Sequence, residues 1–295
     1  MRTTKKKWNP KKICKKTGIY IGALAVLLWT VLPLLWMFLS SITPTVDLLT
    51  IDGKWISDNL NFDRYISIFT ESSGASALSN AGAQFVNSIK ISILVSVTTV
   101  VLAILFGGVA AYAFARLRFR FKGGLLMSTM FFQLLPSITL VIPLYVIARK
   151  IGMIDKPVFL VVLYLSFTLP YVIWVLNGYY KTIPAGLEEA ARIDGCNWLG
   201  AYWRIVLPLA LPGLVAVGAL SFLMCWDEFL YALVFMTSLG SKTMPVAISE
   251  FSTRFGTDYG MVSTAGCLAT IFPLALAVIF QKYIVSGLTA GGIKD

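Results

Sequence analysis

The sequence predicts an all-α protein that crosses a membrane six times, and three observations support this prediction. Of the 295 residues, 57% are hydrophobic and only 13% are charged, whereas about a quarter of the residues in a soluble domain are charged. Six charge-free segments reach the roughly 20 apolar residues that a helix needs to cross a bilayer. The basic residues gather in the loops on one side of these segments. Most of the protein surface therefore faces lipid.

Each predicted membrane helix is rich in Leu, Ile, Val and Phe. The six comprise residues 17–46, 91–115, 123–148, 157–180, 205–226 and 259–281. The basic segment 1–16 resembles the start of a signal peptide, but the apolar stretch after it is too long and no A-x-A cleavage site follows. We therefore expect the first helix to be an uncleaved anchor. Residues 47–90 form the longest loop on the opposite side, where we expect a small folded cap.

Charge decides the orientation, because loops rich in Lys and Arg stay in the cytoplasm. The N-terminus, the loops 116–122 and 181–204 and the C-terminal tail hold 17 Lys/Arg against 4 Asp/Glu, a net charge of +13. The other three loops hold 8 against 10, a net charge of −2, which together gives the overall +11. Both termini are therefore predicted to be cytoplasmic, with the chain in the cell membrane. This sorting explains the basic composition without a nucleic-acid partner.

Several kinds of chemistry are not expected of this chain. It has no His, which excludes His-based catalysis and His-ligated metals. Its cysteines are far apart and form no CxxC pair, so neither a disulfide nor a metal site is expected: Cys14, Cys196, Cys225 and Cys267. The segment 240–243, Gly-Ser-Lys-Thr, lacks the spacing of a phosphate-binding loop. We expect the chain itself to hydrolyse no nucleotide and to be no enzyme.

Small residues and prolines mark places where the membrane helices pack closely or bend. Gly107, Ala111 and Ala115 recur every four residues, a spacing that lets helix backbones approach within one subunit or across to a partner. Prolines interrupt the third to sixth segments. They break helical hydrogen bonds, either in helices that bend around a translocation path or as simple kinks: Pro136, Pro143, Pro170, Pro208, Pro212 and Pro273.

A few polar residues near the membrane are candidates for a solute path. Trp226, Asp227 and Glu228 end the fifth segment, where ionisable groups face protein or water rather than lipid. They form either the lining of a path, with Trp226 as a stacking surface, or an ordinary interfacial helix end. Gln133 and Asn177 are uncharged polar residues in other segments. A sugar site would combine such aromatic and hydrogen-bonding groups.

The loop between the fourth and fifth segments carries the strongest local signal. Pro184 suits a first helical turn, Glu188 and Glu189 complement a helix N-terminus, and Gly195 suits a helix stop. Asn197 then caps a second helix.

On this predicted loop helix, Leu187, Ala190 and Ala191 fall at positions i, i+3 and i+4. They therefore form one face of small apolar residues. A short helix with such a face suits docking into a groove of another protein.

The same residues carry a family resemblance. Residues 189–191, Glu-Ala-Ala, are followed by Gly195 and then by Ile205-x-Leu207-Pro208, a pattern that resembles the EAA loop of ABC importer permeases. Residues 110–118, 226–229 and 287–295 resemble the carbohydrate branch, in particular the second permease of the maltose-type transporters. The resemblance covers residues 18–295. The final Asp departs from it, because many relatives end in Gly.

The resemblance implies an ABC type I importer permease fold with a core at residues 91–284 that includes the coupling loop 181–208. It implies a pore shared with a homologous second permease, two ATPase subunits that bind ATP and Mg, and an external solute-binding protein. This chain itself would hold no cofactor. The implied substrate is a sugar, such as an oligosaccharide or a related polyol.

The resemblance also assigns residues that contact the ATPases. The implied ATPase-coupling residues are Glu188, Glu189, Ala190, Ala191, Asp194, Gly195, Ile205, Leu207 and Pro208. The Gly-rich tail 285–295 is too short and flexible to fold alone, and the family places it in the cleft between the ATPases. Its implied contact residues are Leu288, Thr289, Ala290 and Gly291.

Two other functions fit the sequence less well than sugar import. A secondary transporter would carry ion-coupling carboxylates within its membrane helices, and the predicted helices have no Asp or Glu away from their ends. An ABC permease for glycerol phosphate would need Arg or Lys in the membrane for its anionic solute, and the predicted helices contain neither.

Overall fold

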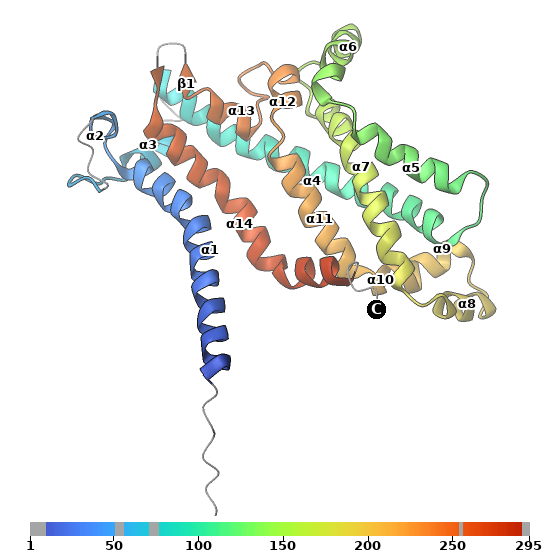
Figure 1. Ribbon diagram of the computed structural model, residues 1–295. Coiled ribbons are helices and arrows are strands. Elements are labelled where there is room, and N and C mark those ends of the chain that lie inside the picture. Colours follow the sequence, from blue (N-terminus) through green and yellow to red (C-terminus); the bar gives the residue numbers. More distant parts are fainter. Residues whose placement is uncertain (1–9, 51–55, 71–76, 254–255, 291–295) are drawn as a thin grey trace, which may run out of the picture.

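A computed structural model describes residues 10–50, 56–70, 77–253 and 256–290. Apart from one hairpin of two short strands, β1 (Ser252–Thr253) and β2 (Gly256–Thr257), its regular structure is helical (Figure 1). The predicted all-α membrane fold is confirmed.

Four helices in the described part of the chain are long and apolar enough to cross a bilayer without interruption. They are α1 (Pro10–Ile42), α4 (Ala77–Arg116), α7 (Pro157–Thr182) and α14 (Tyr259–Ala290). Pro170 and Pro273 lie inside α7 and α14, so these prolines do not end their helices. Membrane helices tolerate proline when neighbouring groups satisfy the freed carbonyl.

The third predicted segment is not one helix. It consists of α5 (Lys122–Gln133) and α6 (Ser137–Lys150), which meet at an angle of 89°. Pro136 occupies the N-cap position of α6 with an extended backbone. Proline cannot donate an N–H to a continuing helix, and it biases the residue before it away from helical geometry. The structure therefore corrects the expectation of a single helix over residues 123–148.

The fifth predicted segment is also broken. A short arm of α9 (Trp198–Ala201), the π-helix η2 (Tyr202–Val206) and α10 (Leu207–Leu209) meets α11 (Leu211–Trp226) at 78°. Pro212 has no N–H for the carbonyl of Pro208, so the helical hydrogen bond across the junction is lost. The continuous part of this span therefore starts at Leu211 and not at Ile205.

Several predicted ends also shift. After α1 the chain forms α2 (Thr45–Leu49) and α3 (Asp63–Thr70), the small cap expected there. The last part of the predicted loop 47–90 already belongs to α4, which begins at Ala77. At the other end of the chain, α14 continues to Ala290. Residues 285–290 are therefore helical, and the expectation of a tail without structure is corrected for them.

The centre of the molecule is the pairing of α4 with α7. A Cβ atom added at Gly107 would lie 2.9 Å from Cγ1 of Val172, so the α4 backbone approaches α7 too closely for a larger residue. Ala111, one turn further, is completely buried. The small residues of α4 therefore pack against α7 of the same chain. Of the two alternatives, packing within the subunit and packing against a partner, the structure shows the first.

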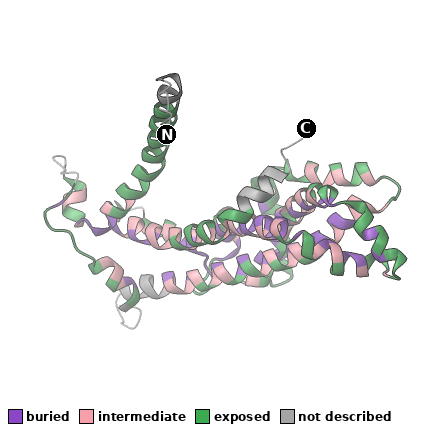
Figure 2. Ribbon diagram, turned by 90° about the horizontal axis from the view of Figure 1, so that it is seen from below, coloured by how far each residue is buried: buried purple, intermediate pink, exposed green. Residues whose placement is uncertain are grey.

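Helix α1 differs from this core. It stands away from the other helices along most of its length, and Figure 2 shows it exposed. Trp29 is 83% exposed, and only the last turns, around Ser41 and Ile42, are buried. In a membrane such a helix faces lipid or another subunit.

The shorter elements gather at two opposite ends of the bundle. One end, here called the α8 end, holds α8 (Ala185–Ile193), α9, the start of α1 and the end of α14 (Figure 1). The other, the α13 end, holds α2, α3, α12 (Leu230–Phe235), α13 (Met244–Ser249) and the hairpin. The candidate sites lie at the α8 end and beside the break between α5 and α6.

Candidate functional site

Helix α8 forms where the local sequence predicts it. Pro184 lies at its N-cap, and Gly195 ends it with a φ of +91°, a left-handed conformation that glycine adopts most easily. The N–H of Cys196 then donates to the carbonyl of Ala191 at 2.9 Å. Asn197 caps the next helix, its side chain accepting from the N–H of Gly200 at 2.7 Å. The predicted start, stop and second cap are confirmed.

A buried ion pair joins α8 to the end of α4. The Glu188 side chain accepts a hydrogen bond from Nε of Arg116 at 2.6 Å and one from the hydroxyl of Tyr112 at 3.0 Å. Arg116 Nη2 also donates to the carbonyl of Ile183 at 2.6 Å. Glu188 is only 3% exposed. We call these three side chains, Tyr112, Arg116 and Glu188, the α8 clamp.

The clamp divides the residues of α8 between two faces. Glu188 and Ala191 are buried against the chain itself. Leu187 and Ile193 are 46% and 87% exposed, and Glu189, Ala190 and Asp194 are exposed as well. The expectation that Leu187, Ala190 and Ala191 share one outward face therefore needs correction, because Ala191 lies on the inner face.

The segment after α8 is fixed by packing of aromatic rings. Tyr202 of η2 is 1% exposed, and its ring centroid lies 5.1 Å from that of Tyr112 and 6.2 Å from that of Tyr180. A Cβ atom added at Gly108 would lie 2.8 Å from the Tyr202 hydroxyl, so only glycine leaves room for it. Of the predicted coupling residues beyond this point, Ile205 and Leu207 are half-buried and Pro208 is exposed.

A second candidate site is a cavity of about 460 Å³ at the break between α5 and α6, here called the elbow cavity. Two predicted path residues, Gln133 and Glu228, both line it. Gln133 Nε2 donates to the carbonyl of Phe167 at 2.8 Å, which joins the end of α5 to α7. The other polar or aromatic residues lining the cavity were not predicted: Phe132, Ser137, Ser166, Phe167 and Tyr231.

The Glu228 side chain is held by the first turn of α12. Its Oε1 and Oε2 accept the N–H groups of Tyr231 at 2.8 Å and Ala232 at 3.2 Å. A carboxylate has about four lone-pair sites, so it can accept further hydrogen bonds from the cavity. Glu228 is therefore both a cap and part of the cavity wall.

Trp226 and Asp227, the predicted path residues next to Glu228, do not line the elbow cavity. Trp226 is 3% exposed and stacks on Phe222 with ring centroids 5.5 Å apart, and Phe272 lies 5.0 Å away. It is a core residue, which corrects its proposed use as an open stacking surface. Asp227 is exposed and lines a separate cavity of about 290 Å³ together with Trp226.

The remaining predicted residues do not join either site. Asn177 is 5% exposed within α7 and does not line the elbow cavity. Of the predicted tail contacts, Leu288, Thr289 and Ala290 form the end of α14, where only the backbone is described. Gly291 lies outside the described residues.

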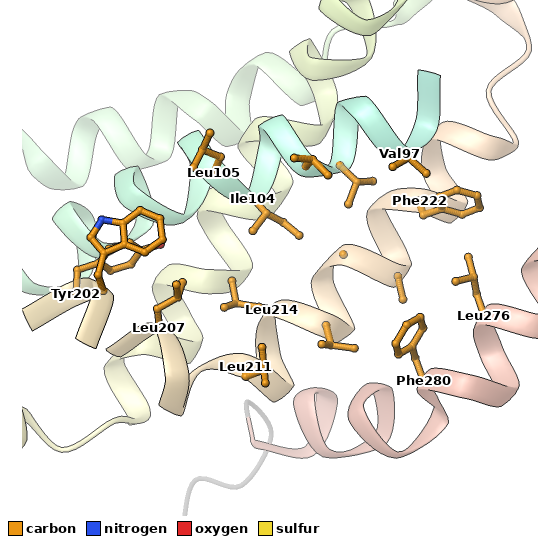
Figure 3. Close-up of a pocket in the computed structure, with 16 residues that line it drawn as sticks. Val97, Ile104, Leu105, Tyr202, Leu207, Leu211, Leu214, Phe222, Leu276 and Phe280 are labelled. Atoms are coloured by element: carbon orange, nitrogen blue, oxygen red, sulfur yellow. The ribbon is translucent and has the colours of Figure 1, made fainter. Parts of the chain in front are cut away.

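A larger cavity, about 590 Å³, lies between α4, η2, α10, α11 and α14. Figure 3 shows Ile104, Leu214 and Phe222 among the aliphatic and aromatic side chains that line it. Such walls favour an apolar occupant, whereas the hydroxyl groups of a sugar would lose their hydrogen bonds to water there. The larger volume is therefore not the candidate sugar site.

At the α13 end, Asp155 ties the α6–α7 turn to the loop after α12. Its Oδ1 accepts hydrogen bonds from the N–H groups of Thr237 at 2.6 Å and Ser238 at 2.8 Å, and from the Ser241 hydroxyl at 2.7 Å. Burial opposes ionisation of Asp155, but these hydrogen bonds outweigh it and hold the pKa of the carboxyl below its usual value.

Sequence reasoning missed the tie at Asp155 and the arginine and tyrosine of the α8 clamp. The sequence does contain a signal for the clamp. Arg116 ends a membrane helix on the same predicted side as Glu188, and Tyr112 precedes it by one helical turn. Such opposite charges at two helix ends on one side are candidates for an ion pair. Asp155 gave no comparable signal.

Known proteins resemble this chain in sequence. Residues 103–290 match the family described as "Binding-protein-dependent transport system inner membrane component". The trehalose transport system permease protein SugB of Mycobacterium tuberculosis is 37% identical over 90% of this chain and 93% of its own length. The diacetylchitobiose uptake system permease protein DasC of Streptomyces coelicolor is 31% identical, with 93% and 95% covered.

Solved structures show the same fold at lower identity. One chain of a bacterial ABC transporter involved in the import of alginate superimposes with a TM-score of 0.72 and 20% identity, covering 95% of this chain and 99% of that one. A chain of the MetNI methionine ABC transporter gives a TM-score of 0.54 with 16% identity, covering 69% and 95%. The chain is a multi-pass membrane permease with the fold of ABC type I importers. It belongs to the family of inner membrane components of binding-protein-dependent transport systems.

Proposed function

We propose that this chain is the permease subunit of an ATP-driven importer that carries a carbohydrate into the cytoplasm. The main support for a carbohydrate substrate is the sequence identity to a trehalose permease over nine-tenths of the chain. The similarity to a diacetylchitobiose permease supports it further. The six predicted membrane segments contain no Lys or Arg that could accompany a phosphorylated solute. Membership of a binding-protein-dependent family also decides against a secondary transporter.

The remaining subunits follow from the same proposal. A homologous second permease completes the pore, two ATPase subunits bind ATP and Mg, and an external solute-binding protein delivers the sugar. A relative in structure was solved together with a periplasmic protein that holds an alginate pentasaccharide. With the strongly basic loops in the cytoplasm, the α8 end and both termini face the ATPases.

Helix α8 is the element best suited to receive the ATPases. Its inner face is fixed to α4 by the α8 clamp, while Leu187, Ala190 and Ile193 face outward. An exposed apolar face on a rigidly held short helix suits insertion into a groove. Movement of the ATPases would then pass through α8 and Arg116 into α4.

The test uses the complete transporter and the substitution Ile193→Asp. Ile193 is 87% exposed, so the variant should fold and reach the membrane. Co-purification of the ATPases and uptake of radiolabelled trehalose should both fall at least about tenfold, because a carboxylate buried at an interface without a partner is costly.

Phe121→Asp is the matched control, since Phe121 is 73% exposed at the same end of the bundle but lies outside α8. It should keep both activities. Normal ATPase binding and uptake with Ile193→Asp would contradict docking at α8. Failure of the unmodified transporter to import trehalose and other neutral oligosaccharides would contradict the carbohydrate proposal.

A further inference from the structure

We infer that the elbow cavity is a binding site within this subunit for an uncharged, hydroxyl-rich sugar, and that Glu228 makes it disfavour acidic sugars. This inference rests on the proposed carbohydrate transport and adds the place of contact and the charge of the solute. Neither the family nor the two permeases named above give the place of contact or the charge of the solute.

The backbone around the cavity supplies polar groups. The 89° break between α5 and α6 interrupts the helical hydrogen bonds around Leu134 and Pro136. In α7, Pro170 has no N–H for the carbonyl of Ser166, which lines the cavity. Irregular backbone at membrane depth persists where it is buried in protein or lines a polar path. The break between α5 and α6 and the hydrogen bond missing at Pro170 both fall beside this cavity.

The side chains around the cavity have the mixture that binds sugars. Gln133, Ser137 and Ser166 are neutral hydrogen-bonding groups, while Phe167 and Tyr231 add aromatic rings. A volume of about 460 Å³ lies within the range of roughly 300–1,000 Å³ usual for small-molecule sites. The cavity therefore has the size and the groups to hold part of an oligosaccharide.

The charge on the wall of the elbow cavity is negative only. Glu228 is the single ionisable carboxylate among the described residues that line the cavity, and none of them is Lys or Arg. Its oxygens are fixed by two backbone N–H groups of α12 but keep lone pairs for sugar hydroxyls. An acidic sugar would bring a second negative charge into the cavity with no cation to pair it, which costs free energy at low dielectric. A neutral sugar avoids this cost.

The charge of the cavity can be measured in the complete transporter after the four cysteines of this chain are replaced. Ser137→Cys then places one thiol on the cavity wall. The rates at which positively and negatively charged methanethiosulfonate reagents modify this thiol are compared. The modification rates are normalised to those at Asn59→Cys, an exposed position between α2 and α3 that does not line the cavity. We expect the cationic reagent to be favoured about tenfold at Ser137→Cys.

Three further variants assign the effect to one carboxylate. Glu228→Gln should bring the rate ratio close to that at the reference position, and Glu228→Asp should keep it high. Asp227→Asn removes the neighbouring carboxylate, which lines the other cavity, and should leave the ratio unchanged. A ratio that Glu228→Gln does not alter, or that Asp227→Asn abolishes, would overturn the assignment to Glu228.

Sugar occupancy is tested with the same reporter. The neutral disaccharide that the transporter imports best, with trehalose tried first, should slow modification of Ser137→Cys by both reagents. A disaccharide that contains a uronic acid should protect less, and the difference should shrink with Glu228→Gln. A sugar that is imported but gives no protection would overturn the cavity site while leaving carbohydrate import intact. Absence of any sugar import would instead contradict the proposed function.

Discussion

At the α8 end of the bundle, one short helix is attached to α4 through the few contacts of the α8 clamp, whereas at the α13 end several loops are tied together by many polar contacts. Glu188 and Arg116 form the first attachment. At the other end, Asp155 joins the loop after α12, Lys242 pairs with Glu250, and the N–H of Met244 donates to Ser92 at 2.8 Å.

The difference bears on how each end moves. Helix α8 has one strong link, to α4, and its opposite face is bare, so it can pass a displacement to α4 as a unit. The α13 end is linked to the α6–α7 turn and to α4 by several side chains, and no single one of them controls it. A ligand can shift a conformational equilibrium only through contacts that differ between the two states. The bare face of α8 is the surface on which such contacts with a partner are expected.

The largest effect is expected from breaking the α8 clamp. Glu188→Ala leaves Arg116 largely buried without its carboxylate, a change that costs about 3–5 kcal/mol when a buried pair loses one partner. Thermal unfolding of the purified protein in detergent should show a midpoint well below that of the unmodified protein. Proteolysis in the loop around α8 should become faster.

Glu188→Gln is the matched control for the clamp. Its amide oxygen can still accept from Arg116, so most of the stability should return. If Glu188→Ala unfolded at the same temperature as the unmodified protein, the clamp would not hold α8 to α4, and the contrast between the two ends would disappear.

A smaller effect is expected from the tie at the α13 end. Asp155→Asn keeps an oxygen for the N–H groups of Thr237 and Ser238 but removes the charge that strengthens these bonds. Asn also tolerates the positive φ of 62° at this position. The expected loss is about 1–2 kcal/mol at neutral pH, measured again by thermal unfolding.

The pH dependence of this loss has a definite sign. The pKa of Asp155 in the folded protein lies below that of the unfolded chain. Its ionisation therefore adds stability above an unfolded-state pKa of about 3.9, and this stability is lost as the pH falls through the folded-state pKa. The difference between the unmodified protein and Asp155→Asn should narrow on acidification. A difference that widens at low pH would contradict the assigned hydrogen bonds.

The smallest effect is expected at the cap of α9. Asn197→Ala removes the bond to the N–H of Gly200 and should cost about 0.5–1 kcal/mol, since losing an N-cap side chain costs typically about 1 kcal/mol. Asn197→Ser can cap the same group and should restore the stability. ATPase coupling should change little in either variant, because the clamp and not the cap joins α8 to α4. Loss of ATPase coupling without loss of stability would instead assign the transmission of movement to the start of α9.

The sequence alone determined the features that depend on local composition. Long charge-free segments identified a membrane protein and predicted six spans, which the structure shows as four continuous helices and two bent pairs. The sorting of Lys and Arg predicted their direction. The loop helix was predicted from its ends, because Pro184, Gly195 and Asn197 act on the backbone within one turn of their own positions. The family resemblance rested on the same loop.

Only the tertiary structure decided which way the side chains face. Glu188 was predicted from the resemblance as an ATPase contact, yet it lies buried against Arg116, 72 residues earlier. Trp226 was a candidate for a solute path and lies in the core, while Asp155 bonds to Ser241, 86 residues away. A uniformly apolar segment shows no periodic pattern to reveal its inner face. Which side of each helix meets its neighbour is fixed by close contacts such as those at Gly107 and Gly108, which exist only once the helices have packed.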